Sequence, residues 1–222
     1  MSEVNELHRR RFLIGAGVVG AGAVLAACGG DDDEAGVAET GSSSTTAGEE
    51  STTTTAGNGE GGGDAAVAAL AASLEVLAVN TYGAALDAAT SGALGEVPPA
   101  VAEFVTTAQG QHQAHLDAWN EVLSAAGQAE VDAPPADLEQ TVNDMFSSVT
   151  DVPGAARLAL LLEDTAAATY LSAIPTLQST DAVQLAGSIC CIDRQHASVL
   201  RFVLGEYPVP EVFGRVDLAY GG

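Results

Sequence analysis

The sequence predicts an all-α protein, in which a bundle of four long helices follows an N-terminal segment that has no core of its own. Three observations predict this fold class. Apolar residues between positions 64 and 205 recur at helical spacing, and no stretch alternates apolar and polar residues as a half-buried strand does. Prolines and glycines divide the region into a few long segments. Two glutamates and two pairs of candidate metal ligands alternate along it, as in a helical bundle built around metal ions.

Residues 1–27 have the composition of an export signal. Three arginines at positions 9–11 precede an apolar run over residues 14–27, which is too short to span a bilayer. Arg9-Arg10 followed by Phe12-Leu13 resembles a twin-arginine signal. The alternative is an N-terminal anchor helix that is never cleaved.

Cys28 ends a second motif, Leu25-Ala26-Ala27-Cys28, which resembles a bacterial lipobox. In a lipobox the cysteine is lipidated and becomes the first residue of the mature protein. We therefore expect an exported lipoprotein on the outer face of the cytoplasmic membrane, with the membrane as its partner through the lipid on Cys28.

Residues 28–63 are rich in Ser, Thr, Gly, Ala and acidic residues, with no aromatic residue and almost no bulky aliphatic one. Such a segment cannot bury enough apolar surface to offset its chain entropy. The composition predicts a disordered linker that spaces the following domain from the membrane.

The chain is strongly acidic, with 30 Asp and Glu against 7 Lys and Arg and a formal net charge of −23 at pH 7. It contains no lysine, and Arg9, Arg10 and Arg11 all lie in the predicted signal. This charge repels phosphate backbones and excludes nucleic acid as an expected partner. It also argues against adhesion to anionic lipid, so the lipid is expected to hold the protein at the membrane. The oligomeric state is left open, with a homo-oligomer as one option.

The predicted bundle spans residues 64–205. Its first helix is expected over residues 65–90, with Asp64 as the N-cap. The second starts at the two prolines 98–99, because proline is tolerated in a first turn, and stops at Gly127.

A shorter helix is expected over residues 137–148. The third long helix starts at Asp151 and Pro153 and is expected to kink or end at Pro175, and the fourth runs from Asp181 to Gly205. The tail at residues 206–222 contains aromatic residues and prolines, and we expect it to dock on the bundle or on a neighbouring subunit.

Glu75 and Glu163 lie in apolar runs of the first and third helices, and each is followed seven residues later by a tyrosine, Tyr82 and Tyr170. A carboxylate in an apolar stripe is costly if it is buried without a partner, which favours a metal or histidine partner. A rotation of the stripes toward solvent would remove this argument. The two tyrosines are expected beside the site, as packing residues or as hydrogen-bond donors to the carboxylates.

The second and fourth helices each contain a pair of candidate ligands three residues apart, His112 with His115 and Asp193 with His196. At this spacing both side chains of a pair project from one face of a helix. The order of glutamate, pair, glutamate, pair makes the two helix pairs resemble two copies with pseudo-two-fold symmetry. Histidines held in a core by hydrogen bonds alone are the alternative.

This ordered set resembles the ferritin-like domain of the di-iron carboxylate kind, close to the exported ferritin-like and desiccation-related proteins of bacteria. In that family the first and third helices each supply a Glu, and the second and fourth each supply a Glu-x-x-His pair. The resemblance implies a site that holds one or two ions, with iron expected and manganese or zinc as alternatives. The implied metal ligands are Glu75, His112, His115, Glu163, Asp193 and His196.

Two positions depart from the family pattern. His112 stands where the second helix of the family has a glutamate, and Asp193 stands at the same position of the fourth. A neutral imidazole does not offset the repulsion between two cations as a bridging carboxylate does, and aspartate has a shorter reach. These departures leave open whether the site binds a second ion.

The resemblance implies metal-dependent redox chemistry, either the oxidation of ferrous iron or the consumption of dioxygen or peroxide. The rival function is a metal-free or degenerate bundle that acts as a structural or stress-related interaction module. Enzymatic activity, of a ferroxidase-like or peroxidase-like kind, is left open between the two. Cys190 and Cys191 are adjacent on the fourth helix and are expected to be small buried hydrophobic residues rather than a disulfide.

Overall fold

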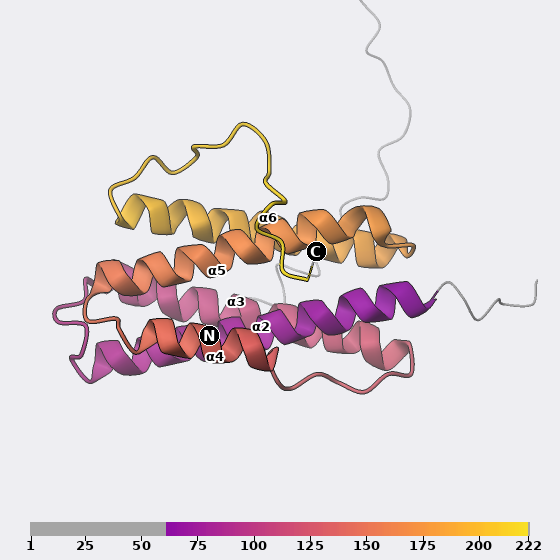
Figure 1. Ribbon diagram of the computed structural model, residues 1–222, viewed down its shortest axis with the longest axis horizontal. Coiled ribbons are helices and arrows are strands. Elements are labelled where there is room, and N and C mark those ends of the chain that lie inside the picture. The colour runs from indigo at the N-terminus through magenta and orange to yellow at the C-terminus, as the bar shows by residue number, and fades with distance from the viewer. Residues whose placement is uncertain (1–60, 222) are drawn as a thin grey trace, which may run out of the picture. The chain divides into compact units, whose positions relative to one another are not determined.

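The computed structural model describes residues 61–221, with side chains from residue 63. The predicted export signal, Cys28 and nearly all of the predicted linker lie outside the described residues. The described part is helical and contains no strand, which confirms the all-α prediction (Figure 1). Its elements are α2 (Gly61–Thr90), α3 (Pro99–Ala125), α4 (Ala136–Phe146), α5 (Val152–Ala173), the 3-10 turn η1 (Ile174–Thr176) and α6 (Thr180–Val203).

The four long helices form two pairs, α2 with α3 and α5 with α6. The pairs are joined mainly through α2 against α5 and α3 against α6. Figure 1 shows the long helices lying side by side, with the short α4 along the outside of the bundle, where it contacts α5. This arrangement of two helix pairs is the predicted one.

Alanines let the helices approach closely at the centre of the bundle. Ala68 of α2, Ala108 of α3, Ala167 of α5 and Ala186 of α6 all have an exposed fraction of 0%. Close helix packing leaves little room for solvent, so the polar side chains that point inward must find partners there.

The helix boundaries follow the predicted signals closely. The Asp151 carboxylate accepts a hydrogen bond from the Gly154 N–H at 2.8 Å and caps α5, and Pro175 falls in the 3-10 turn that ends it. Gly127 and Gly205 follow α3 and α6 with φ angles of 69° and 76°, a left-handed conformation that costs glycine nothing.

Asp64 does not cap its own helix, so that prediction is wrong. α2 already begins at Gly61, inside the segment predicted as linker. The Asp64 carboxylate instead accepts hydrogen bonds from the backbone N–H groups of Gln178 and Ser179, at 2.9 and 2.8 Å. These two residues immediately precede α6, so Asp64 ties the start of α2 to the start of α6.

α2 is the one described helix that is long and apolar enough, by length and composition, to cross a membrane. It packs against α3 and α5, and it carries the buried Glu75 toward them. These contacts explain its apolar composition as that of a central helix in a bundle.

The last residues of the chain dock on the bundle. The Tyr220 N–H donates to the Thr169 hydroxyl at 2.9 Å, and the Arg194 guanidinium donates to the Arg215 carbonyl at 3.4 Å. Of the two adjacent cysteines, Cys190 is half-buried and its thiol donates to the Ala167 carbonyl, whereas Cys191 is exposed. The prediction that both are buried is therefore wrong for Cys191, because neighbouring side chains on a helix diverge.

Candidate metal centre

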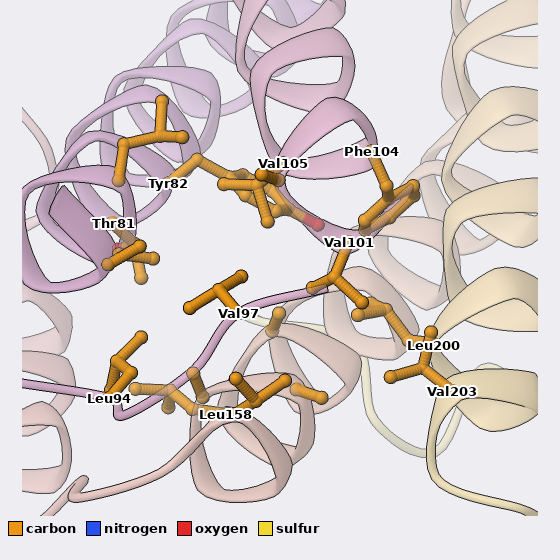
Figure 2. A pocket seen from close by; sticks show the side chains of 18 of the residues that line it. Thr81, Tyr82, Leu94, Val97, Val101, Phe104, Val105, Leu158, Leu200 and Val203 are labelled. Carbon is orange, nitrogen blue, oxygen red and sulfur yellow. The ribbon is translucent and has the colours of Figure 1, made fainter. Parts of the chain in front are cut away.

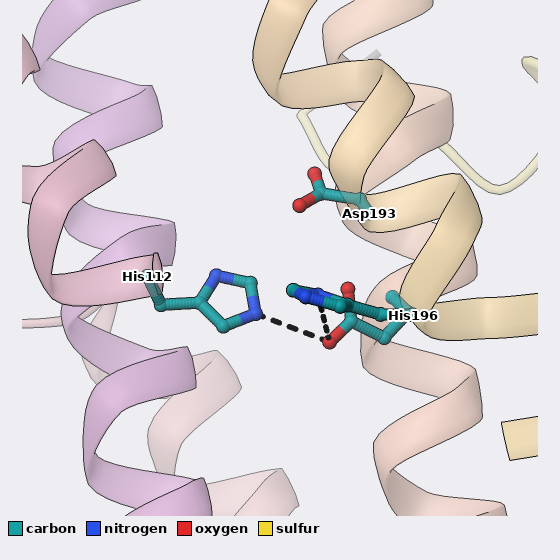
Figure 3. Close-up of side chains that lie close together, drawn as sticks. His112, Asp193 and His196 are labelled. Carbon is teal, nitrogen blue, oxygen red and sulfur yellow. Dashed lines mark hydrogen bonds and ion pairs between the residues drawn. The ribbon is translucent and has the colours of Figure 1, made fainter. Parts of the chain in front are cut away.

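The six candidate ligands lie together in the middle of the bundle. Glu75, His112, Glu163 and Asp193 have exposed fractions of 2% or less. His196 is also buried, and His115 is half-buried. Figure 3 shows His112 pointing from α3 toward Asp193 and His196 on α6. The glutamates therefore face inward, which excludes a rotation of their helical faces toward solvent.

His112 joins the two glutamates. Its Nδ1 lies 2.7 Å from Glu75 Oε2, and its Nε2 lies 3.1 Å from Glu163 Oε1. When both ring nitrogens carry a proton, each donates to one of these carboxylates. One imidazole thus connects α2 with α5 through α3.

The two tyrosines hold the glutamates from the opposite helix pair. The Tyr82 hydroxyl of α2 donates to Glu163 Oε1 of α5 at 2.5 Å, and the Tyr170 hydroxyl of α5 donates to Glu75 Oε1 of α2 at 2.5 Å. The predicted role as carboxylate donors fits these contacts. The crosswise pairing was not predictable from spacing, which places each tyrosine on the same face as the glutamate of its own helix.

Several buried polar atoms of the cluster have no hydrogen-bond partner. They are His115 Nδ1, Glu163 Oε2, both carboxylate oxygens of Asp193, and His196 Nδ1. His115 Nδ1 lies 3.6 Å from Glu75 Oε2, which is too far for a hydrogen bond. An unsatisfied buried polar atom is costly and rare in a folded protein. Five of them in one cluster require a common explanation.

The geometry of two overlapping groups suits a metal ion. His112, Glu163, Asp193 and His196 form one group, and Glu75, His112 and His115 form the other. In each group, one potential ligand atom per residue lies within 4.8 Å of those of the other members. His112 belongs to both groups, at the position where the family pattern has a bridging glutamate.

Burial and the neighbouring charges shift the pKa values of His112 and Glu163 in opposite directions. Burial lowers the pKa of His112, but the charge of Glu163 and hydrogen bonds to Glu163 and Glu75 outweigh it and raise the pKa well above its ordinary value. Burial raises the pKa of Glu163, but the charge and hydrogen bond of His112, with His196, lower it to about 2. The two glutamates and an imidazolium at His112 therefore form a buried ion-pair network.

The pKa of Asp193 is shifted in the direction opposite to that of Glu163. Burial, followed by the negative charges of Glu75 and Glu163, raises the pKa of its carboxyl group well above the ordinary value. The pKa values of both tyrosines also lie well above their ordinary range, because of burial and then the charge of the nearby glutamate. The tyrosines therefore keep the protons that they donate, and Asp193 resists ionisation unless a cation approaches.

Gln111 is a site residue that spacing did not reveal. Its Oε1 lies 2.6 Å from His196 Nε2, so the Nε2–H of the imidazole donates outward. Nδ1 of His196 faces the cluster and lies 3.3 Å from Glu163 Oε1, and in the tautomer with the proton on Nε2 it offers a lone pair to a cation. Gln111 directly precedes His112 in the sequence, and no motif distinguishes it from the neighbouring Gln113.

Two further aromatic residues, Trp119 and Phe104, belong to the surroundings of the site. Trp119, with an exposed fraction of 0%, donates its Nε1–H to the Tyr170 hydroxyl at 2.8 Å. The Phe104 ring lies edge-on to the ring of His196, with centroids 5.7 Å apart. Each therefore contacts a group that touches the cluster.

The residues present fit a transition-metal ion. Three imidazoles and three carboxylates are the donor types that iron, manganese and zinc take. The unsatisfied atoms belong to the candidate ligands His115, Glu163, Asp193 and His196. A bound cation would satisfy these atoms and favour the ionised form of Asp193.

The chain was compared with known proteins. The family described as "Ferritin-like domain" matches residues 63–206. Among solved structures, the chain is similar to the crystal structure of a conserved hypothetical protein, rv2844, from Mycobacterium tuberculosis. The two are 25% identical, the match covers 69% of this chain and 99% of that one, and the TM-score is 0.55. No curated protein matches the chain.

Proposed function

The chain belongs to the family of ferritin-like domains, and from this premise we propose that it binds one or two transition-metal ions, foremost iron, in an exported protein anchored to the membrane. The observation that carries the proposal is the group of five unsatisfied buried atoms on candidate ligands inside a ferritin-like bundle. Manganese and zinc are the alternatives that the same donor set accepts.

Each side chain has a distinct part in holding such an ion. Glu75 and Glu163 supply negative charge, and Tyr170 and Tyr82 fix their orientation by donating to one oxygen of each. His115 and His196 offer nitrogens that have no hydrogen-bond partner. The surrounding helices exclude water, which strengthens every electrostatic interaction within the cluster.

The chemistry that bound iron would supply is the exchange of single electrons with dioxygen or peroxide. Two ferrous ions held by the candidate ligands would supply the two electrons that, with two protons, reduce one dioxygen to hydrogen peroxide. The chain's part is to hold the protons of Tyr82 and Tyr170 at their hydroxyls and those of Asp193 and His112 within the cluster. The last two are the groups that give up protons when a cation binds.

One observation favours the rival function of a metal-free interaction module. His112 already lies within hydrogen-bonding distance of Glu75 and Glu163, at 2.7 and 3.1 Å, and as an imidazolium it offsets half of their charge without an ion. A bundle stabilised in this way has no need of metal to fold.

Elemental analysis of protein exported by its own host separates the two functions. We expect one or two metal ions per chain in the native protein and fewer in His115→Ala. This variant is informative because His115 Nδ1 has no hydrogen-bond partner within the protein, so the change removes a candidate ligand without breaking a hydrogen bond of that nitrogen. Gln113→Ala, at an exposed position on the same helix, is the matched control. Native protein with almost no metal would exclude the metal-binding function.

We also propose membrane attachment through a lipid at Cys28, supported by the motif of residues 25–28 after a signal with twin arginines. Cys28→Ala should leave the protein unprocessed or release it from the membrane fraction. Cell fractionation and the intact mass of the mature protein measure this. An unchanged mass and distribution would refute lipidation.

A further inference from the structure

An apolar cavity lies at the end of the bundle where α2 turns into α3 (Figure 2). Its volume is about 50 Å³. The walls come from α2, the connection over residues 91–98, α3, α5 and the last turns of α6. Leu94, Val97, Val101, Leu158, Leu200 and Val203 are among the residues that line it.

The lining offers no free hydrogen-bonding side chain. Only Thr81 and Tyr82 carry polar side-chain atoms there, and both are already engaged. The Thr81 hydroxyl donates to the Leu77 carbonyl at 2.8 Å, and the Tyr82 hydroxyl donates to Glu163. Because a buried water needs two or more polar partners, a cavity of this kind stays dry and accepts small apolar molecules.

The cavity reaches the metal cluster through two aromatic rings. Tyr82 lines it and stacks on His112, with ring centroids 5.5 Å apart. Phe104 lines it as well and lies edge-on to His196 at 5.7 Å. Figure 2 shows Tyr82 and Phe104 at the cavity together with Val101 and Val105 of α3.

A second, smaller apolar cavity lies beside Tyr82. Its volume is about 30 Å³, and it shares Tyr82 and Leu162 with the first. His112 and Glu163 themselves line it. Tyr82 and Leu162 thus border both the larger cavity and the space that touches two candidate ligands.

The size and chemistry of the cavity select among the oxidants that a metal centre could use. Dioxygen is a small apolar molecule that loses no hydrogen bonds when it leaves water. Hydrogen peroxide has two O–H donors, and to move them into a dry cavity without partners costs several kcal/mol. A volume of about 50 Å³ accommodates a diatomic molecule and excludes a long alkyl chain.

We propose that this apolar cavity binds dioxygen and is the route by which dioxygen reaches the cluster. The inference rests on the proposed function and deepens it, because it names dioxygen rather than peroxide as the oxidant that the bundle is built to admit. Tyr82 and Leu162 form the passage between the two cavities.

The binding step is tested on metal-free protein by NMR under dioxygen pressure. Dioxygen is paramagnetic, so it speeds the relaxation of methyl groups that it contacts. We expect the methyl groups of Val101, Leu158 and Leu162 to relax faster with rising dioxygen pressure than those of Leu123, a buried residue that does not line the cavity. Equal effects at all four residues would overturn the proposal, whatever the metal content of the protein.

Filling the cavity tests the route. Ala85 of α2 lines the cavity, and Ala88, three residues further on the same helix, is half-buried and is not among the lining residues. Ala85→Leu should abolish the methyl relaxation effect and slow the oxidation of bound ferrous iron by dioxygen several-fold, with oxidation by peroxide unchanged. Ala88→Leu should change none of the three. Ala102→Leu, which fills the cavity from α3, serves in place of Ala85→Leu if that variant does not fold.

The outcomes separate this inference from the proposed function. If Ala85→Leu loses the relaxation effect and its rate with dioxygen does not fall, or its rates with dioxygen and peroxide fall alike, the route is refuted although iron is bound. If the wild-type chain takes up no iron, the proposed function fails and the route with it, and NMR alone decides whether the cavity binds dioxygen.

Discussion

His112 occupies the position where the two candidate metal groups overlap, and its ring is the only one that contacts both glutamates among the described residues. Without an ion, the imidazolium provides the positive charge that two buried carboxylates need. An ion that uses a ring nitrogen of His112 must first displace its proton. Metal binding is therefore an exchange of one cation for another at the centre of the bundle.

Glu163 and Asp193 should respond in opposite ways to loss of charge in the metal-free protein. Glu163 accepts hydrogen bonds from Tyr82 and His112, so Glu163→Gln leaves His112 with half of its ionic partner and should cost about 3 kcal/mol of unfolding free energy. Asp193→Asn replaces a carboxyl group that has no hydrogen-bond partner and whose raised pKa costs stability as pH rises above 3.8, so it should stabilise the metal-free protein at neutral pH. Urea unfolding in the presence of a chelator measures both.

The same two variants should respond alike to metal. Each removes a candidate ligand charge, so both should lose most of the stabilisation that saturating metal gives to the wild type. An Asp193→Asn variant that keeps the full metal-dependent increase would show that Asp193 is no ligand.

Gln111 should influence the metal affinity only indirectly, through its hydrogen bond with His196. Gln111→Met keeps the volume of the side chain and removes the acceptor for His196 Nε2–H, which frees the imidazole to change tautomer. The loss of such a partner typically weakens metal binding by about 10- to 100-fold. Gln113→Met is the control, because Gln113 is exposed and donates only to Asp117. Competition titration with a metal-binding dye gives both affinities, and equal affinities would contradict the role of Gln111.

The sequence predicted which residues meet, but not which atoms. Helical spacing gives the face on which Glu75 or His112 lies, and this was enough to bring the six candidate ligands together. It does not give the side-chain rotamer or the partner across the bundle, so Gln111 and the exchange of tyrosines between helix pairs could not be predicted. Sequence alone also suggests that Glu75→Gln would be neutral or stabilising without metal, as removal of a charge from an apolar stripe. The hydrogen bonds from His112 and Tyr170 reverse that expectation.

At the scale of the helices, the sequence signals were accurate where the partner is local. Asp151 caps the helix that follows it, and Gly127 and Gly205 follow the helices that they were expected to end. Asp64 was misinterpreted because an acidic residue before an apolar run suggests a cap, whereas its actual partners lie 114 and 115 residues away in the sequence. Interactions over such distances leave no local pattern.

Asp64→Ala should therefore loosen the contact between α2 and α6 and leave α2 helical. The change removes two hydrogen bonds to backbone N–H groups and should cost about 1–2 kcal/mol. Asp87→Ala, at an exposed position near the other end of α2, should cost much less. Thermal unfolding gives the difference, and hydrogen exchange at Gln178 and Ser179 should rise only in Asp64→Ala. A loss of helix at residues 61–68 instead would restore the N-cap interpretation.

At the scale of the whole molecule, the pKa shifts in the cluster predict how stability depends on pH. The pKa of His112 is raised above 6.5, so its contribution is complete below pH 6.5 and is lost as pH rises through the folded-state value. The raised pKa of Asp193 acts in the same direction, from pH 3.8 upward. The pKa of Glu163 is lowered from 4.5 to about 2, so its contribution is complete above pH 4.5 and is lost as pH falls toward 2. The cluster should thus stabilise the metal-free bundle most in mildly acidic solution.

The measurement is a series of urea unfolding curves from pH 4 to 8 in chelator. Above pH 6.5 we expect stability to fall by up to about 1.4 kcal/mol per pH unit while His112 keeps its proton in the folded state. Saturating metal should reverse the trend, because binding releases these protons and strengthens as pH rises. Asp193→Asn should flatten the metal-free slope. A metal-free protein whose stability rises steadily from pH 5 to 8 would contradict the assigned protonation of the cluster.

The crosswise hydrogen bonds between the helix pairs have the form of a contact between two identical subunits. In a symmetric dimer each contact occurs twice, once in each direction, and Tyr82 with Glu163 and Tyr170 with Glu75 are such a doubled contact within one chain. In such a dimer the two binding positions are identical by symmetry. One chain that carries both hairpins is free of this constraint, because His112 lies opposite Asp193 and Trp119 stands at the position equivalent to Leu200. The two halves of one centre can therefore be tuned separately.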